Sequence, residues 1–250
     1  MKKLLSLLLL TGTLFAQANN VFTLNPSVNS AGMGNVGIAN ADVKNVFHNP
    51  AFAGLRESHQ EVSYVDWLPN LTDDMGYQSI LYTSDLGWSS ELFYFNYGEQ
   101  TQSDQYGVIL GDFESASFRI SGGWGFGYKD WLVGARLNLY NHSFIDDFDI
   151  DMNYGFDIGA YKEFGDTSIG IVLKDVGGET KFLDQELNLP MSVGIGVGHK
   201  IGNFTLASDV KVFEDYNSIG LGGQYDLGIA SLKLGYYTES EFDVDYLTLG

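Results

Sequence analysis

The sequence predicts an all-β protein, an antiparallel transmembrane β-barrel, on three observations. From Phe118 to Tyr128 every second residue is apolar, aromatic or glycine, and the residues between them are polar or glycine. A period of two is that of a strand with one apolar face. Aromatic rings stand at both ends of that face, as they do where lipid lies outside a barrel. The alternation recurs along the chain, behind a secretory signal.

That signal occupies residues 1–18. Lys2 and Lys3 form its basic region, an apolar run begins at Leu4, and Ala16-Gln17-Ala18 is a small-x-small cleavage site. The apolar run is too short to span a membrane as a helix. We therefore expect the mature protein to start at Asn19. The rest of the chain has no apolar run near 18 residues, so no transmembrane helix is predicted.

Composition narrows the possible functions. The formal net charge is −19, from 13 Lys and Arg against 32 Asp and Glu, and no basic stripe is present. Nucleic acid is therefore excluded as a partner. The chain has no cysteine, so neither disulfides nor thiolate chemistry are available. Its 31 glycines, 15 tyrosines and 17 phenylalanines against four prolines suit a glycine- and aromatic-rich β chain.

The first mature segment, residues 19–56, does not alternate. It is rich in small residues and holds Ala31-Gly32-Met33-Gly34 and Asn49-Pro50-Ala51. We expect it to fold against or into the barrel as a hatch. Asn49, Pro50 and Ala51 are expected to fix a turn there rather than to contact a ligand.

Residues 57–250 are expected to form the barrel. Alternation and turn residues predict twelve strands. They are His59–Asp66, Gly76–Ser84, Trp88–Tyr97, Ser115–Tyr128, Trp131–Tyr140, Met152–Glu163, Thr167–Lys174, Pro190–Lys200, Phe204–Phe213, Asn217–Asp226, Ala230–Tyr237 and Phe242–Leu249. A soluble β-sandwich would explain the alternation equally well. It explains less well the rings at strand ends and the glycine-rich second face.

Connection lengths give a second indication. Short links such as Lys129–Asp130 alternate with longer ones, as tight periplasmic turns alternate with outer loops in such barrels. This pattern requires Gln105–Asp112 to be an outer loop with some local strand rather than a full crossing. The final residues, Asp245 to Gly250, look like the middle of a strand. We expect a chain that lacks roughly two closing strands, because an open edge in lipid exposes unsatisfied backbone groups.

A family resemblance is carried by several motifs in order. Ser30-Ala31-Gly32-Met33-Gly34, followed by Asn49-Pro50-Ala51, resembles the start of the PorV/PorQ family. The later motifs resemble successive strand ends and starts of that family. They are Leu173-Lys174-Asp175-Val176-Gly177, Leu189-Pro190, Gly222-Gly223-Gln224-Tyr225 and Leu232-Lys233-Leu234-Gly235-Tyr236. The sequence departs at Gln224 and Lys233, where the family often has Glu and Arg.

The resemblance implies a FadL-like outer-membrane barrel of about 14 strands when complete, about 12 of them here. Characterised relatives take part in type IX secretion, where such a barrel receives secreted cargo and delivers it to the attachment machinery. In FadL-type fatty-acid channels the N-terminal segment forms a hatch inside the lumen. These implications set the two main hypotheses about function.

No enzyme, cofactor or metal site is expected. Asn141-His142-Ser143 has the residue types of a serine hydrolase, but adjacent strand residues point to opposite faces. The four histidines lack metal-ligand spacing. The acidic segment Asp146–Asp151 could hold Ca²⁺, yet it lacks the glycine and terminal glutamate of an EF-hand, so a solvated loop is preferred. A further set of charges is expected to face the lumen and to pair across it: Arg119, Arg136, Lys174, Asp209 and Lys211.

The preferred hypothesis is an outer-membrane accessory of protein secretion that binds secreted cargo and secretion or attachment machinery at its outer loops. The candidate loops are Trp67–Met75, Asn141–Asp151 and Asp175–Leu189. The alternative is a FadL-like channel for hydrophobic small molecules such as fatty acids. Its hatch would gate an apolar pocket containing Phe22, Leu24, Met33 and Phe52, leading to a lateral opening. A structural barrel without transport is the third possibility. All three place the outer surface against outer-membrane lipid.

Overall fold

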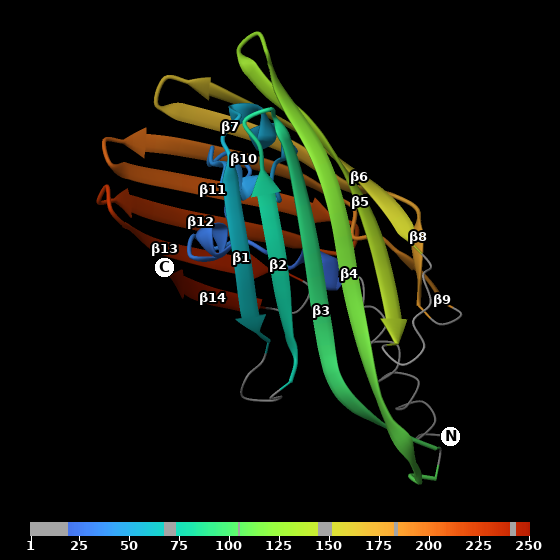
Figure 1. Cartoon of the computed structure of the whole chain (residues 1–250). Coiled ribbons are helices and arrows are strands. Elements are labelled where there is room, and N and C mark those ends of the chain that lie inside the picture. Colours follow the sequence, from blue (N-terminus) through green and yellow to red (C-terminus); the bar gives the residue numbers. More distant parts are fainter. Residues whose placement is uncertain (1–19, 68–73, 105, 145–151, 183–184, 241–243) are drawn as a thin grey trace.

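The computed structural model describes residues 20–67, 74–104, 106–144, 152–182, 185–240 and 244–250. Twelve strands of this part form one antiparallel sheet, in chain order from β1 at one edge to β14 at the other, which curves around the N-terminal segment (Figure 1). They are β1 His59–Asp66, β2 Gly76–Thr83, β3 Trp88–Ser103, β4 Ile109–Tyr128, β5 Trp131–Phe144, β6 Asn153–Phe164, β7 Thr167–Gly177, β10 Ser192–Ile201, β11 Phe204–Phe213, β12 Asn217–Asp226, β13 Ser231–Glu239 and β14 Val244–Leu249.

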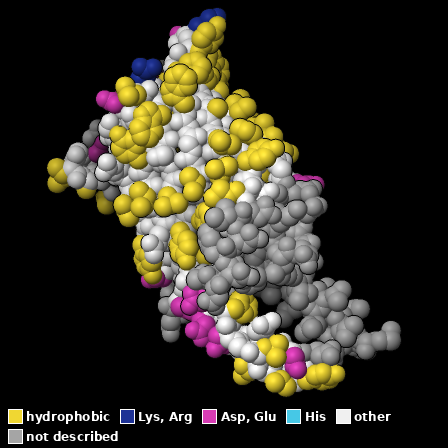
Figure 2. All heavy atoms as spheres, turned by 45° about the vertical axis from the view of Figure 1, so that its right-hand side comes forward, with side chains coloured by type: hydrophobic (Ala, Val, Ile, Leu, Met, Phe, Trp, Pro, Cys, Tyr) yellow, Lys and Arg dark blue, Asp and Glu magenta, His cyan; other side chains and the backbone are white. Residues whose placement is uncertain are grey.

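The all-β antiparallel prediction is confirmed, and the alternation sets the two faces of the sheet. In β10, Val193, Ile195 and Val197 point outward and are exposed, whereas Ser192 and Gly194 point inward and are buried. Since the side-chain period is two, this register puts all apolar side chains of the strand on the outside. Figure 2 shows such hydrophobic side chains spread over the visible face of the body of the molecule.

The largest departures from the predicted strands lie at one end of the sheet, which we call the loop end because the longer connections are there. The opposite end is the turn end. Strand β3 continues to Ser103 and β4 begins at Ile109, so of the expected outer loop Gln105–Asp112 the described residues 106–112 belong to a hairpin, while Gln105 lies outside the described residues. Strand β5 continues beyond Tyr140 to Phe144. A small hairpin, β8 Glu179–Phe182 and β9 Gln185–Asn188, lies within Asp175–Leu189. These additions satisfy backbone hydrogen bonds without side-chain alternation, which is why the sequence pattern misses them.

The N-terminal segment lies on the inner face of the sheet (Figure 1). It consists of short turns: η1 Asn20–Thr23, α2 Val28–Ala31, η2 Val43–Asn45 and η3 Pro50–Leu55. Each of the last three begins after a capping residue whose side chain accepts a hydrogen bond from a backbone N–H of the first turn. The capping residues are Ser27, Asp42 and Asn49. No helix in the described ranges has the length and apolar character needed to cross a membrane. The signal sequence expected at residues 1–18 lies outside those ranges.

Inward-facing glycines on the strands, which we call the wall glycines, let the N-terminal segment lie close against the inner face of the sheet. A Cβ at Gly220 would come within 2.5 Å of the Gly34 carbonyl oxygen, and one at Gly125 within 2.5 Å of the Gly54 nitrogen. The same close approach of backbone to backbone occurs at Gly134, Gly170, Gly196, Gly222 and Gly235, whereas Gly159 faces the side chains of Asn49 and Pro50. Only glycine allows the hatch backbone to approach the strands so closely.

The N-terminal segment also contacts both edges of the sheet. The Val28 amide donates to the Glu61 carboxylate on β1 at 3.1 Å. On the other side, the Gly34 amide donates to the Thr248 hydroxyl on β14 at 2.9 Å. The segment therefore spans the interior from one edge strand to the other.

Candidate functional site

A charged layer lies on the inner face of β3, β4 and β5. Glu91 accepts a hydrogen bond from Arg119 at 2.5 Å and another, shorter one from Arg136. All three side chains are almost completely buried. Arg119 also donates to the Phe22 carbonyl oxygen at 2.5 Å, which ties the layer to the hatch. A carboxylate shared by two guanidinium groups compensates part of the cost of burying three charges.

Phe47 of the hatch packs against three cations of this layer. The Lys174 ammonium lies 3.6 Å from the centre of the ring, and the Arg119 and Arg136 guanidinium carbons lie at 4.7 and 5.7 Å. A ring face attracts cations most strongly where water is excluded. Phe47 therefore attaches the hatch to the charged layer through its ring face, without a carboxylate from the hatch at this contact.

Two aspartates complete the layer on β6 and β7. The Asp175 amide donates to the Asp157 carboxylate at 2.8 Å. The Asp175 carboxylate in turn accepts from the Tyr140 hydroxyl. Asp157 and Asp175 are both buried close to Lys174, so three acidic groups balance three basic ones here.

A second polar contact holds the middle of the hatch. One Asp209 carboxylate oxygen, on β11, accepts from the backbone amides of Gly37 at 2.7 Å and Ile38 at 2.9 Å. Lys211, two residues further along β11, donates to the Asn35 carbonyl oxygen at 3.3 Å. The five charges expected to face the lumen thus all lie against the hatch, Arg119, Arg136 and Lys174 in one group and Asp209 and Lys211 in another.

His48 lies between these two groups. Its Nε2 atom is 2.9 Å from the Ser30 hydroxyl, and the side chain is 1% exposed. Burial lowers the pKa of His48 well below its usual value, and the positive charges of Lys211, Lys174 and Arg136 lower it further. The neutral imidazole is therefore the form that fits the docked hatch.

The hatch motifs make mainly structural contacts. Asn49 caps η3 and donates to the carbonyl oxygens of Ile38 at 2.9 Å and Ala160 at 3.2 Å. Pro50 and Ala51 follow in the first turn of η3, buried against β5. In the other motif Gly34 has a φ of +69° and Met33 is fully buried against β12, while Gly32 contacts Lys233.

At the loop end the inner face becomes aromatic. Phe22 lies 4.7 Å from Tyr140 between ring centres, and Tyr77 lies 5.4 Å from Phe93. The rest of this mouth cluster is made of neighbouring side chains at the same end. They are Val21, Leu24, Val65, Trp67, Met75, Phe95, Tyr97 and Leu189. Most of these side chains are buried, so the inner face at the loop end is covered by a packed apolar and aromatic cluster.

The expected hatch pocket is wrong in its composition. Phe22 and Leu24 belong to the mouth cluster, but Phe52 packs with Val46 and Tyr161, and Met33 packs with Val36 and Ala207. The four side chains therefore lie in three separate clusters. The physical reason is that the hatch backbone lies directly against the wall glycines, so each apolar side chain of the hatch packs only against its local neighbours.

The sequence did not identify Glu91 as the centre of the charged layer, because a single acidic residue in a short alternating stretch of β3 belongs to no recognisable motif. It also missed the pairing of His142. The His142 Nδ1 atom lies 2.6 Å from the Ser117 hydroxyl on the adjacent strand, rather than against Ser143. Ser117 is fully buried and also donates to Tyr97 at 3.0 Å, so this contact links strands.

No group of three or more metal-ligating side chains is present in the described residues. The possible calcium loop, residues 146–151, lies outside them.

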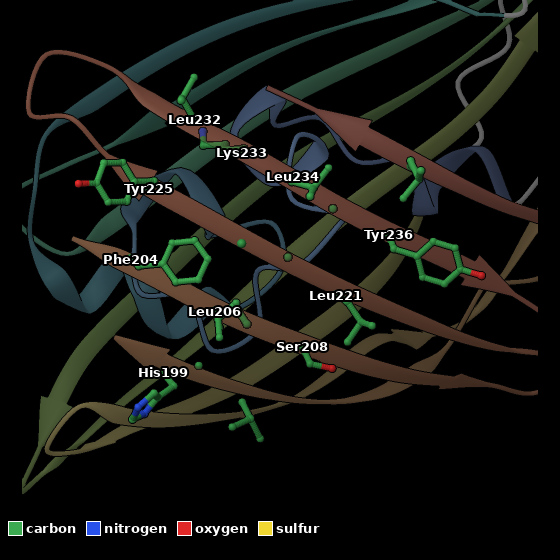
Figure 3. A pocket seen from close by; sticks show the side chains of 17 residues that line it. His199, Phe204, Leu206, Ser208, Leu221, Tyr225, Leu232, Lys233, Leu234 and Tyr236 are labelled. Atoms are coloured by element: carbon green, nitrogen blue, oxygen red, sulfur yellow. The ribbon is translucent and has the colours of Figure 1, made fainter. Parts of the chain in front are cut away.

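An apolar groove of about 770 Å³ lies on the outward face of β10–β14 (Figure 3). Leu206, Leu221 and Leu234 project around it, and Gly222 and Gly235 lie in its floor. The hatch contacts the other side of those two glycines. The sheet therefore separates this groove from the interior, and its apolar lining belongs to the exposed apolar side chains of the outward face.

The fold has counterparts among solved structures. The structure titled "TodX deltaS2S3 mutant monoaromatic hydrocarbon channel" matches with a TM-score of 0.61 and 11% identity over 86% of this chain and 83% of that one. The toluene transporter TbuX of Ralstonia pickettii matches with a TM-score of 0.57 and 14% identity, covering 90% of this chain and 88% of that one. The toluene transporter TodX of Pseudomonas putida gives 0.55 and 10%, with 88% and 87% coverage. No protein-family model and no curated protein matches the sequence.

These matches confirm the expected FadL-like barrel fold with an N-terminal segment packed against the strands. They do not extend to the PorV/PorQ family in particular. These matches therefore give no support to the expectation of a secretion role.

Proposed function

We propose that this protein is a FadL-like channel of the outer membrane that admits hydrophobic small molecules. The observation that carries the proposal is the mouth cluster, a continuous set of apolar and aromatic side chains on the inner face at the loop end. Most of these side chains are buried against one another, so an apolar solute would reach them only when the hatch moves, and it would then gain about 25 cal/mol for each Å² of apolar surface that it buries.

Two further features support the proposal. The outward face carries exposed apolar side chains of the kind that lipid requires, while the opposite face combines polar and glycine residues with the aromatic cluster of the loop end. The solved structures that share the fold have titles naming toluene transporters and a monoaromatic hydrocarbon channel. Small aromatic hydrocarbons are the substrate class that would fit rings such as Phe22, Tyr77 and Phe95.

Passage requires the hatch to move. Behind the mouth cluster lie the charged layer and then the docked backbone of the hatch, which spans the interior between the edge strands. A hydrophobic solute cannot cross the buried charges unless the contacts of Phe47 and Asp209 rearrange. We therefore assign to the hatch the role of a gate, held closed by polar contacts.

Toluene uptake tests the proposal. The full-length protein, in the outer membrane of a host without a hydrocarbon channel, should raise the rate of radiolabelled toluene uptake but not of glucose uptake. Phe22→Ala, in the mouth, should lower the toluene rate. The control Phe204→Ala changes a ring on the outward face and should leave the rate unchanged. Uptake no faster than in host cells without the protein, or equal uptake of both solutes, would overturn the proposal.

A role in protein secretion is the second candidate function. The motif resemblance favours it, and so does an exposed apolar hairpin tip around Tyr106, Ile109 and Leu110 at the loop end, which a small-molecule channel does not need. Affinity purification of the full-length protein, gently solubilised from its own outer membrane, tests this role. Secreted proteins that share a C-terminal β-domain would establish it, and bound lipid without protein would contradict it.

A further inference from the structure

Strands β3 and β4 extend beyond their neighbours as a two-stranded ribbon, described over residues 97–104 and 106–114. Pairing of β2 with β3 ends at Gly76 opposite Asn96, and pairing of β4 with β5 ends at Ser115 opposite Phe144. Beyond these points the described strands pair only with each other. Figure 1 shows the ribbon projecting past the rest of the sheet at the loop end.

The ribbon is held in a defined shape. At its tip the Asp104 carboxylate accepts from the amides of Tyr106 at 2.8 Å and Val108 at 2.9 Å. The Gly107 amide donates to the Asp104 carbonyl at 3.0 Å, and Gly107 has a φ of +81°. At its base the Glu99 amide donates to the Asp74 carboxylate at 2.7 Å. The tip is therefore a turn preorganised by its aspartate.

This turn presents apolar side chains to solvent. Tyr106 is 83% exposed, Ile109 is 69% exposed and Leu110 is 60% exposed, and Val108 lies between them. The tip of the ribbon lies at the lower end of the molecule in Figure 2, away from the hydrophobic side chains on the body of the sheet. A lone two-stranded hairpin is marginally stable in water, and exposed apolar groups do not stabilise it. A clustered apolar tip of this kind is typical of an interaction site.

The charge around the tip has one sign. Glu99, Asp104, Asp112 and Glu114 are acidic, and there is no lysine or arginine from Tyr97 to Phe118. Glu99 and Glu114 stand directly opposite each other across the two strands. Like charges in opposed positions destabilise a strand pair. A positively charged partner would remove this repulsion, whereas an anionic lipid surface or a nucleic acid would increase it.

We propose that the ribbon tip is a docking surface for another polypeptide, one with an apolar cleft bordered by lysine or arginine. The cleft would take Tyr106, Ile109 and Leu110, and its basic rim would face Glu99 and Glu114. A second copy of this chain is a poor occupant, because 32 acidic residues against 13 basic ones leave little complementary charge. The proposal holds whether the barrel conducts hydrophobic solutes or not, so its failure and that of the channel are separate results.

Site-specific photocrosslinking in the native outer membrane tests it. A benzophenone amino acid replaces Tyr106 in the full-length protein, and the crosslinked peptides are mapped by mass spectrometry. The control position is Met152, which is also exposed at the loop end but lies off the ribbon. We expect one dominant polypeptide adduct at Tyr106, absent at Met152, whose crosslinked segment holds lysine or arginine beside apolar residues.

Two sets of variants show whether the recognised chemistry is the proposed one. Changing Ile109 and Leu110 together to Asn should abolish the adduct. Glu99→Gln with Glu114→Gln should lower its yield by roughly threefold or more at low salt and by less at high salt, since salt screens exposed charges. The control Asp85→Asn, in a turn at the other end, should have no effect. Adducts with lipid, with a second copy of this chain, or with the same mixture of proteins as at Met152 would overturn the proposal.

Discussion

The Asp209 carboxylate on β11 accepts a 2.9 Å hydrogen bond from the backbone amide of Ile38 in the N-terminal segment. The same oxygen accepts the amide of Gly37 at 2.7 Å. Two successive amides on one ionised acceptor form a strong, directional contact inside the barrel. It joins a part of the hatch that lies outside its short helical turns to strand β11. Asp209 is therefore the first side chain to change in order to release the hatch.

Asp209→Ala should loosen the middle of the hatch. The substitution leaves the Gly37 and Ile38 amides buried without an acceptor, and hydrogen bonds to charged groups contribute about 1.5–3 kcal/mol. Because each 1.36 kcal/mol is tenfold in an equilibrium, the two amides should exchange with deuterium roughly 10- to 100-fold faster. Hydrogen–deuterium exchange on the protein in lipid vesicles measures this directly.

The matched control for that experiment is Asp226→Ala. Asp226 also accepts a backbone amide, from Gly228 at 2.7 Å, but in an exposed turn. The Asp226→Ala variant should leave deuterium exchange in the hatch unchanged. Equal exchange rates at Gly37 and Ile38 with and without the Asp209 carboxylate would show that the hatch is held by its other contacts.

Adding one methyl group to an inward glycine should displace the hatch. In Gly125→Ala the new Cβ lies 2.5 Å from the Gly54 nitrogen and 3.0 Å from the Ala51 carbonyl oxygen. Overpacking of this kind costs about 1–3 kcal/mol. The urea midpoint of unfolding in vesicles should fall accordingly. The control is Gly122→Ala on the same strand, whose Cβ has nothing within 4 Å. If both variants unfold at the same urea concentration, η3 does not depend on the close approach at Gly125.

The sequence predicted the strands well wherever one face is apolar. His59–Asp66 and Phe204–Phe213 have the predicted bounds. The ribbon formed by Tyr97 to Glu114 was not predicted in its full length, since its pairing depends on backbone geometry between polar residues. The close contacts of the wall glycines with the hatch also could not be foreseen, because they depend on where a distant segment lies.

The candidate site was predictable only in part. The sequence predicted that five charged side chains lie on the inner side of their strands: Arg119, Arg136, Lys174, Asp209 and Lys211. Their partners did not follow from the sequence. Arg119 and Arg136 meet on Glu91, and Lys174 lies on the Phe47 ring. Such contacts join residues far apart in the chain, and a single sequence gives no signal for them.

Removing the carboxylate of Glu91 should destabilise the barrel strongly. Glu91→Gln leaves two buried guanidinium groups without their shared counter-charge, and breaking a buried ion pair in this way costs about 3–5 kcal/mol. Urea unfolding in vesicles, followed by tryptophan fluorescence, gives the change in free energy. Phe47 and the Phe22 carbonyl contact the same cations, so hatch exchange should increase in the same variant.

The surface pair of Lys162 with Asp130, 3.5 Å apart, supplies the comparison. Asp130 is largely exposed, and exposed pairs contribute at most about 1 kcal/mol. Asp130→Asn should therefore change the unfolding free energy little. A loss at Glu91 as small as that at Asp130 would mean that water or another acid replaces the missing carboxylate.

Acid should weaken docking of the hatch through His48. Burial, with Lys211, Lys174 and Arg136, keeps the pKa of this imidazole below its usual value, so the docked form does not take up a proton when the pH falls below about 6.5. A released hatch does take up a proton, so the free energy of docking weakens by up to about 1.4 kcal/mol per pH unit below that point and is unchanged above it.

Deuterium exchange of the amides around His48, corrected for the intrinsic pH dependence of amide exchange, should therefore become faster as the pH falls from 7.5 to 5. In His48→Gln this rise should disappear, whatever the variant does to docking at pH 7.5, while His199→Gln, at an exposed site, should keep it. The same rise in His48→Gln as in the unaltered protein would assign the acid sensitivity to the carboxylates of the charged layer instead.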